Sequence, residues 1–269
     1  MKLTFGIVTG GGQEEYINKI IDSIEEEQIP DYEIVVVGSF LTARNNTIVY
    51  LFPEDIVPMW ITKKKNLIAE VARGEILVLM HDYIRLEKGW YQGFLRFQNE
   101  NPVWDVAMCK VKDMTGLRLI DWMGLTGDKI YGNVLLPYEY SNPKGMYVPG
   151  NFFMVKRDFL RANPLDERRN WGLGEDVEWS KRIFGGVENA PVIRNLLQKP
   201  LDVEIPEPEN PAIYRMNLYS SVTCVKEKQI HAWFRNEYDM HTPDIERPIG
   251  FKIEDYVYMQ KRLERKIES

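Results

Sequence analysis

The 269-residue sequence contains only two cysteines, Cys109 and Cys224. Two cysteines provide no disulfide framework, and they suit a reducing compartment. The sequence also lacks a long apolar run, since none approaches the ~20 residues that a membrane-spanning helix needs. Its first residues, MKLTFGIVTGGG, are interrupted by glycine too early to be a signal peptide. We therefore expect a cytoplasmic protein with no membrane span.

A surplus of basic residues is missing as well. The chain has 34 Lys and Arg against 40 Asp and Glu, for a formal net charge of −6. The absence of a broad basic surface argues against a nucleic-acid partner. With 44% hydrophobic and 28% charged residues, the composition is that of an ordinary globular protein. The length allows one large α/β domain or two small ones.

Strand and helix signals alternate along the first hundred residues. Continuous apolar runs predict strands at Leu3–Thr9, Tyr32–Val37, Thr47–Leu51 and Glu75–Met80. Helical spacing predicts helices from Ile17, from Thr62 as N-cap to a stop at Gly74, and over 87–99. Further on, Trp104–Val111 and Tyr147–Val155 are candidate strands. This alternation predicts a mostly parallel central sheet covered by helices on both faces.

Polar residues follow three of the predicted strands at the point where each strand ends. They are Thr9-Gly10, Gly38-Ser39 and His81-Asp82. Because ligands of open α/β sheets bind at the carboxyl ends of the strands, we expect these residues to converge on one binding edge. The alternative interpretation of His81 and Asp82 is that they only cap a strand.

The stretch WGLGEDVEWSKR, residues 171–182, places two glycines directly before a group of acids. One interpretation is a helix N-terminus, where acidic side chains complement the helix dipole. The other is a catalytic carboxylate on a glycine-hinged loop. Within the following helix, Glu178 and Arg182 are spaced as an ion pair and Trp179 is expected in the core.

Four blocks, EIVVVGS, KKKNLIAEVARGEILVLMHDY, YVPGNFFMVKRDFL and WGLGEDVEWSKR, occur in an order that resembles the GT-A glycosyltransferases, especially the family 2-like group. The resemblance covers roughly residues 2 to 195. It implies a Rossmann-like, mostly parallel sheet flanked by helices and transfer of a sugar from a nucleotide-diphosphate sugar. We expect a catalytic domain over residues 1–200 and a C-terminal extension over 201–269 that packs on the same domain.

The resemblance also implies a donor site, which we expect to bind a UDP-sugar. Its candidate residues are Thr9, Ser39, Lys65, Asn66, His81 and Asp82. Lys65 would contact phosphate, although Lys63 to Lys65 could equally be a solvated helix start. Val36 and Val37 stand where many relatives have acidic residues, one of which contacts the uracil base.

By the same resemblance, an acidic triplet after the strand Glu75–Met80 holds Mn²⁺ or Mg²⁺ on the donor diphosphate. Here the triplet reads His81, Asp82, Tyr83, and tyrosine replaces the usual metal-binding aspartate. Oxygen ligands and a neutral imidazole suit such cations. Asp82 and His231 are therefore our candidate metal ligands; His241 is the remaining histidine.

For the chemistry, the resemblance places Asp176 at the general base of inverting relatives, with Glu175 bonding to substrate hydroxyls. A carboxylate must remove the acceptor's proton, because a hydroxyl is a poor nucleophile. Trp171 would close over the sugar, and Trp122 would stack on the acceptor, which we expect to be a glycan or a lipid-linked molecule. The alternative near Trp122 is an ion pair between Arg118 and Asp121.

Two other function classes compete with a glycosyltransferase of glycan biosynthesis. A catalytically silent protein that binds nucleotide or sugar on the same scaffold is favoured by Tyr83 and by the valines before Gly38. A nucleotidyltransferase would carry a basic phosphate loop after its first strand, but TGGGQEE has acids in place of the basic residue.

Overall fold

The computed structural model describes residues 2–52, 54, 59–125, 133–141, 143, 146–169, 174–185 and 208–225. Its strands are β1 (Leu3–Val8), β2 (Tyr32–Val37), β3 (Thr47–Tyr50), β4 (Ile76–His81), β5 (Ile84–Leu86), β6 (Val106–Lys112), β7 (Met123–Leu125), β8 (Asn133–Leu135), β9 (Met146–Tyr147), β10 (Phe152–Lys156) and β11 (Tyr214–Cys224). Its helices are α1 (Glu14–Glu26), α2 (Ile61–Val71), α3 (Trp90–Glu100), α4 (Arg157–Ala162) and α5 (Glu175–Phe184).

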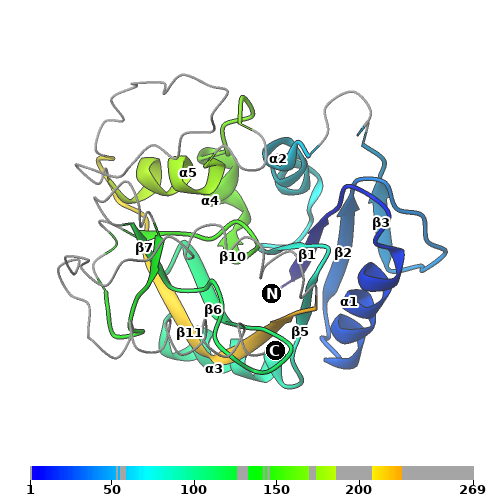
Figure 1. Ribbon diagram of the computed structural model, residues 1–269, viewed down its shortest axis with the longest axis horizontal. Helices are drawn as coiled ribbons and strands as arrows, with labels where there is room; N and C mark the ends of the chain where they lie inside the picture. The colour runs from blue at the N-terminus through cyan, green and yellow to red at the C-terminus, as the bar shows by residue number, and fades with distance from the viewer. Residues whose placement is uncertain are drawn as a thin grey trace, which may run out of the picture.

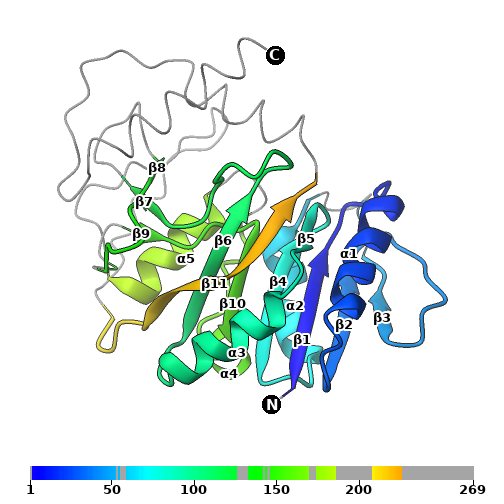
Figure 2. The same ribbon diagram turned by 90° about the horizontal axis from the view of Figure 1, so that it is seen from below.

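Eight of these strands form one large sheet in the order β3-β2-β1-β4-β10-β6-β11-β5. Parallel pairs join β1 to β2 and β4, β2 to β3, and β6 to β11. Strand β10 runs antiparallel between β4 and β6, and β5 runs antiparallel to β11. A small sheet, β8-β7-β9, lies beside the large one (Figure 2). The predicted α/β architecture with a mostly parallel central sheet is confirmed.

Helices cover both faces of the large sheet. Figure 1 shows α2, α4 and α5 on one side and α1 and α3 on the other. Consecutive residues of β1 illustrate why, because side chains of a strand alternate between faces. The ring of Phe5 packs edge-on against Trp90 of α3, with ring centroids 5.7 Å apart. On the opposite face a Cβ on Gly6 would lie 2.7 Å from Ile68 of α2, so glycine there lets α2 approach the sheet.

The apolar stripe of α1 is buried as its spacing predicts. Ile17, Ile20, Ile21 and Ile24 are all fully inaccessible to solvent. Each buried isoleucine contributes about 1.5–3 kcal/mol relative to an exposed one, so this stripe attaches α1 firmly to the sheet.

Several predicted elements differ from those of the structure. Thr62 is not the N-cap of α2, because the helix begins one residue earlier and the Thr62 hydroxyl donates to the carbonyl of Arg169. The predicted strand Tyr147–Val155 is two strands, β9 and β10, separated by a turn that contains Pro149 and Gly150. Strand β11 was not predicted; it lies in the range of the expected extension, yet it belongs to the large sheet.

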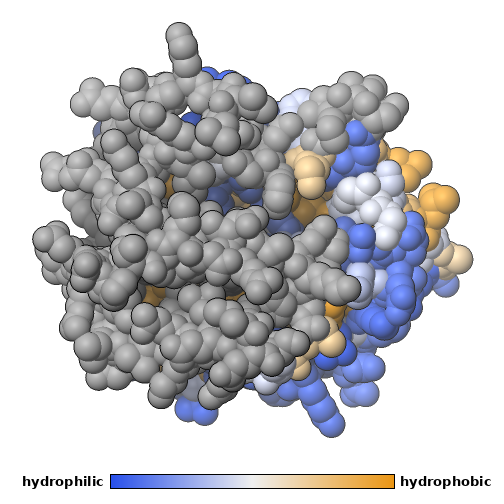
Figure 3. Space-filling view, in the orientation of Figure 1, coloured by the Kyte–Doolittle hydropathy of each residue, from blue (hydrophilic) through white to orange (hydrophobic). Residues whose placement is uncertain are grey.

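The described surface around α1 and β3 is mostly hydrophilic, with apolar side chains gathered at its outer edge (Figure 3). Leu41, Ile48 and Leu51, on β3 and the loops beside it, have exposed side chains. Within the described ranges, none of the helices combines the length and the apolar character needed to cross a membrane.

A substitution at Gly38 tests the close approach of β1 and β2. Gly38 has a φ of 141°, and a Cβ there would lie 2.0 Å from the carbonyl oxygen of Thr9. We expect Gly38→Ala to lower the free energy of unfolding by about 2 kcal/mol or more, because both the backbone and the contact become strained. Urea unfolding with Gly10→Ala as control measures this, since a Cβ on Gly10 meets no described atom within 4 Å. Equal stability of the two variants would contradict the described approach of the strands.

Candidate active site

The three polar strand ends converge as predicted. Val8, the last residue of β1, is paired with Val37 of β2 and with His81 of β4. The residues that follow therefore meet at one edge, where the Thr9 hydroxyl donates a 2.7 Å hydrogen bond to Asp82. We call this set, Thr9 to Gly12, Gly38-Ser39 and His81 to Tyr83, the strand-end edge.

Glycines leave main chain accessible along the strand-end edge. Gly11 and Gly12 have φ values of 92° and 69°, which glycine adopts without strain. A Cβ on Gly10 or Gly12 would meet no described atom within 4 Å, so both face open space in the described part of the chain. Ser39 is exposed, and its Cβ lies 2.9 Å from where a Cβ on Gly11 would be. This edge can therefore present backbone groups and a hydroxyl to a ligand.

His81 and Tyr83 are bound to each other. His81 Nδ1 lies 2.8 Å from the Tyr83 hydroxyl, and the rings meet edge to face at 5.3 Å. Burial, with the nearby Cys224 and acidic groups, raises the pKa of Tyr83 far above its ordinary value. The phenol therefore keeps its proton, and a protonated phenol is a poor replacement for a carboxylate as a ligand of a hard cation.

A second cluster lies at the start of α5. Gly174 precedes the helix with a φ of 66°, and Glu175 and Asp176 occupy its first turn. Asp176 accepts two backbone hydrogen bonds, from Gly150 at 3.1 Å and from Val177 at 2.8 Å. The prediction of a helix start is thus confirmed, and the same acids also face a turn that is distant in sequence. The acids lie in the helix and not on a loop, and the catalytic role of Asp176 stays a prediction.

Lys65 reaches the same turn from α2. Its side chain is fully buried, and Nζ donates a 2.7 Å hydrogen bond to the carbonyl of Gly150. A Cβ on Gly150 would lie 3.2 Å from Lys65 Nζ, 3.4 Å from Glu175 Oε1 and 3.5 Å from Asp176 Cβ. An ammonium and two carboxylates therefore surround one glycine. We call Lys65, Gly150, Glu175 and Asp176 the carboxylate cluster.

Burial controls the charges of the carboxylate cluster. Desolvation, reinforced by the neighbouring Asp176 and opposed by Lys65, raises the pKa of Glu175 to about 7. Desolvation also raises the pKa of Asp176, although the N–H groups of Gly150 and Val177 and the charge of Lys65 oppose it. The pKa of Lys65 is lowered by desolvation against the attraction of both carboxylates. Glu175 can therefore gain or lose a proton near neutral pH, beside an Asp176 whose pKa is raised in the same direction.

Two backbone contacts join the carboxylate cluster to the strand-end edge. The His81 N–H donates to the carbonyl of Asn151, the residue after Gly150, at 3.0 Å. Lys64, which precedes Lys65, donates at 2.7 Å to the carbonyl of Thr9 and also pairs with Glu54. Consecutive buried lysines of α2 thus contact both groups, so α2 holds the carboxylate cluster beside the strand-end edge.

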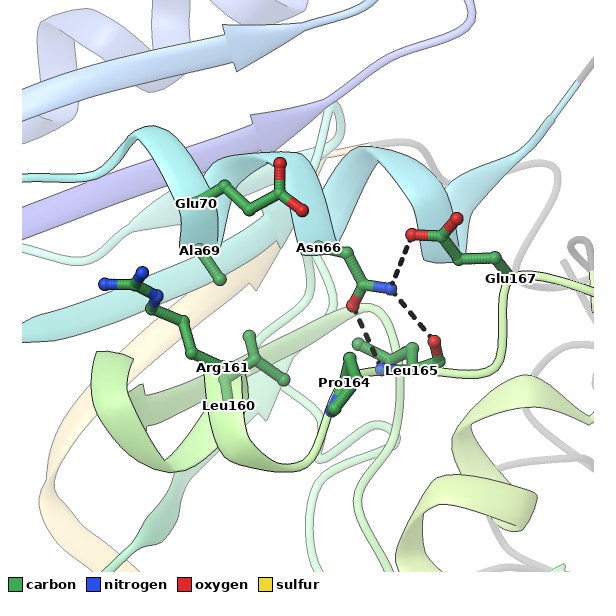
Figure 4. Close-up of a pocket in the computed structure, with 8 residues that line it drawn as sticks. All are labelled: Asn66, Ala69, Glu70, Leu160, Arg161, Pro164, Leu165 and Glu167. Atoms are coloured by element: carbon green, nitrogen blue, oxygen red, sulfur yellow. Dashed lines mark hydrogen bonds between the residues drawn. The ribbon is translucent and has the colours of Figure 1, made fainter.

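Asn66 points away from this site, toward α4. Its amide accepts from the Leu165 N–H at 3.0 Å and donates to the Leu165 carbonyl at 2.9 Å and to Glu167 at 3.0 Å. Figure 4 shows these bonds beside a groove between α2 and α4. The groove has a volume of about 390 Å³ and includes Glu70 and Arg161 in its lining. Because its amide binds the segment after α4, Asn66 lies apart from the strand-end edge, where we propose that the donor binds.

Trp122 is buried as well. It is 3% exposed, its ring packs 4.4 Å from that of Tyr214, and its indole N–H donates to the Tyr140 carbonyl. The alternative ion pair beside it is present, since Arg118 binds Asp121 at 2.8 Å. Little of the indole is therefore available to a sugar.

The other predictions near α5 have mixed outcomes. The pair of Glu178 and Arg182 is confirmed at 2.6 Å, and Trp179 is in the core at 1% exposure. Trp171 and His231, the second acceptor candidate and the second metal candidate, lie outside the described residues.

The described residues do not fit a divalent metal on their own. Among them, no group of three or more His, Cys, Asp and Glu side chains is arranged to hold a metal ion. At the strand-end edge our predicted metal ligand is the carboxylate of Asp82, which already accepts a hydrogen bond from the Thr9 hydroxyl. Tyr83 keeps its proton at the position of the usual aspartate. We therefore derive no step through a metal.

Sequence reasoning missed Gly150 and the contact of Lys64 with Thr9. A signal for Gly150 was present, because YVPGN places proline and glycine directly before an apolar strand. Such a turn falls at a strand end, but its contact with α5 requires knowledge of the antiparallel pairing of β10 with β4.

No protein-family model matches this sequence, and no curated protein matches it either. Its structure is similar to that of S. aureus TarS 1-349 in complex with UDP, with a TM-score of 0.50, 15% identity, and coverage of 83% of this chain and 60% of that one. It is also similar to GalNAc-T7 with UDP, GalNAc and Mn²⁺, with a TM-score of 0.53, 14% identity, and coverage of 83% and 44%.

The chain has the GT-A fold. At these identities the likeness establishes the fold and does not establish the activity, because one fold hosts many functions. The chain spans 60% and 44% of the lengths of the two structures.

The high pKa of Glu175 predicts a specific dependence of stability on pH. Between about pH 4.5 and 7 the Glu175 carboxyl is ionised in the unfolded chain but still protonated in the folded chain. The free energy of unfolding therefore falls as the pH rises through this range, and the loss levels off above about pH 7. Glu175→Gln removes this cost. We expect the variant to gain up to about 3 kcal/mol over wild type at pH 8 and little at pH 4.5.

Urea unfolding of both proteins at the two pH values measures the gain. Glu178→Gln is the matched control, because it removes an acid of the same helix that pairs with Arg182 and should not stabilise the protein at pH 8. A difference between Glu175→Gln and wild type that is the same at both pH values would contradict the assignment.

Proposed function

We propose that this protein is a glycosyltransferase that moves a sugar from a nucleotide-diphosphate sugar, a UDP-sugar in our prediction, to a hydroxyl group of a glycan or lipid-linked acceptor, with inversion. The observation that carries the proposal is the carboxylate cluster, in which a half-buried Asp176 of raised pKa lies beside the strand-end edge of a GT-A sheet. The UDP in the TarS and GalNAc-T7 structures supports a nucleotide donor.

In this proposal the strand-end edge binds the donor. Thr9, Ser39, His81 and Asp82 are its ligands, with the accessible backbone of Gly10 to Gly12. The nucleoside diphosphate is negatively charged, and glycine-rich loops let main-chain N–H groups approach phosphate closely. A divalent metal held by Asp82 and His231 stays a prediction; GalNAc-T7 was solved with Mn²⁺.

Asp176 acts as the general base. The acceptor oxygen attacks the anomeric carbon as Asp176 takes its proton, and the bond from that carbon to the diphosphate oxygen breaks, leaving the electron pair on the nucleotide. A carboxylate whose pKa is raised is a stronger base at the moment of transfer. Glu175, which keeps its proton up to about pH 7, can donate a hydrogen bond to a substrate oxygen.

The single substitution Asp176→Asn tests this function. Asparagine keeps the size of the side chain and can accept one of the two backbone hydrogen bonds, so the free energy of unfolding should change by about 1 kcal/mol. Loss of the base should lower the transfer rate ~10²–10⁴-fold. Donor affinity should stay within about threefold, because the donor binds at the strand-end edge. Glu178→Gln is the control and should transfer at the wild-type rate.

Transfer is measured with a panel of nucleotide sugars, after thermal stabilisation has identified the nucleotide that binds. A transfer rate of the Asp176→Asn variant above a tenth of the wild-type rate would contradict the assignment of Asp176 as the general base. A wild-type protein that binds a nucleotide sugar and transfers nothing to any acceptor would favour the silent binding protein, which the Tyr83 substitution also suggests.

A further inference from the structure

Lys65 is the most completely buried charge of the site. It is fully inaccessible, whereas the side chain of Lys63, two residues earlier, is 37% exposed and pairs with Glu167. Burying an ammonium is costly unless it is hydrogen-bonded and lies near an opposite charge. Both conditions are met at Gly150, where Lys65 bonds to the carbonyl and the two carboxylates of α5 surround the same glycine.

The turn that Lys65 binds determines two further contacts. The Gly150 N–H donates to Asp176, and the Asn151 carbonyl accepts from His81. The Gly150 carbonyl lies between these two groups in the chain, so the hydrogen bond from Lys65 restricts the turn that carries both. The turn at Gly150 therefore contacts both Asp176 and the end of β4.

We infer that Lys65 is a positioning residue for Glu175 and Asp176: its buried ammonium fixes the turn at Gly150 and keeps a positive charge beside the two carboxylates. The inference rests on the proposed function. It replaces the role that its sequence position suggested, contact with the donor phosphate, because its ammonium is buried and already bound to the main chain.

The charge of Lys65 acts on both acids. Among the described residues, the titratable groups that act on the pair are Lys65 from α2, Arg169 from the segment before α5, and Tyr83 from the turn after β4. Lys65 is the cation that lowers the pKa of both Glu175 and Asp176, and Arg169 acts on Glu175. Without Lys65, the pair should hold its protons to higher pH, and less of Asp176 would be ionised at neutral pH.

Lys65→Met tests this, since methionine keeps the length of the side chain and removes its charge. Lys65→Arg restores the charge, and Lys63→Met removes a lysine of the same helix outside the cluster. The first readout needs no substrate: ¹³C NMR titration of the carboxyl carbons of Glu175 and Asp176. We expect Lys65→Met to raise the pKa of the pair by about 1–3 units, Lys65→Arg to bring it back toward wild type, and Lys63→Met to leave it unchanged.

The second readout is the pH profile of transfer. In Lys65→Met we expect the acidic limb of the kcat profile to move to higher pH by about 1–3 units. The donor KM should stay within about threefold of wild type. An unmoved profile with a donor KM raised tenfold or more would show a phosphate ligand instead. A loss of kcat that is equal at every pH and follows a lower Tm would show a merely structural role. Either result overturns the inference.

The two readouts separate this inference from the proposed function. A wild-type protein without transfer activity, together with shifted carboxyl pKa values in Lys65→Met, would reject the function and retain the positioning. Transfer by the wild-type protein, together with unshifted carboxyl pKa values in Lys65→Met, would support the function and reject the positioning role. If Lys65→Met fails to fold, Gly150→Ala replaces it, because the added methyl group would push against both Lys65 and Glu175 while keeping every charge. Its carboxyl pKa values should rise, and unchanged values would contradict the inference.

Discussion

The parallel register of β1 with β2 and β4 is the constraint on which the site depends. Because Val8 is opposite both Val37 and His81, the three strands end at the same level and their following loops meet. The bond from Thr9 to Asp82 and the contact of Gly38 with Thr9 follow directly from this alignment. A shift of one residue in either pairing would place the strand ends at different levels and turn their side chains to the opposite face of the sheet.

Helix α2 connects that edge to the carboxylate cluster. Lys64 bonds to Thr9 and Lys65 bonds to Gly150, so two neighbouring side chains contact loops that are far apart in sequence. Each buried ammonium has a main-chain carbonyl as partner, and each also has an acid nearby, Glu54 for Lys64 and the α5 pair for Lys65. The energetic cost of burying lysine thus restricts how α2, the Gly150 turn and α5 can be arranged.

Much of this fold could be predicted from local pattern. The runs of β1, β2 and β4 are continuously apolar and end in polar residues, and the isoleucines of α1 recur at helical spacing. Strand β11 could not be predicted this way, because YRMNLYSSVTC mixes polar residues into a bulged strand whose main partner, β6, lies about a hundred residues earlier. The strand predicted over Tyr147–Val155 is interrupted because proline and glycine turn the chain before β10.

The sequence predicts the local structure around the acids of the candidate site better than the surroundings of its lysine. The position of Glu175 and Asp176 after two glycines predicts a helix start, which the structure confirms, whereas their chemical roles come from the resemblance and stay a prediction. The position of Lys65 suggested phosphate contact, because nothing in KKKN shows which lysine is buried. That depends on Gly150, 85 residues away, and on the packing of α5 against it. The resemblance suggests Asn66 and Trp122 as donor and acceptor ligands, yet each binds protein in the structure.

Amide hydrogen exchange with and without UDP tests the central claim most directly, namely that the strand-end edge is a nucleotide site. The account predicts slower exchange in the segments 9–12, 38–39 and 81–83 when UDP is bound, with smaller changes around Gly150. Protection confined to α2 and α4, beside the groove that Glu70 and Arg161 line, or no protection at saturating UDP, would contradict it.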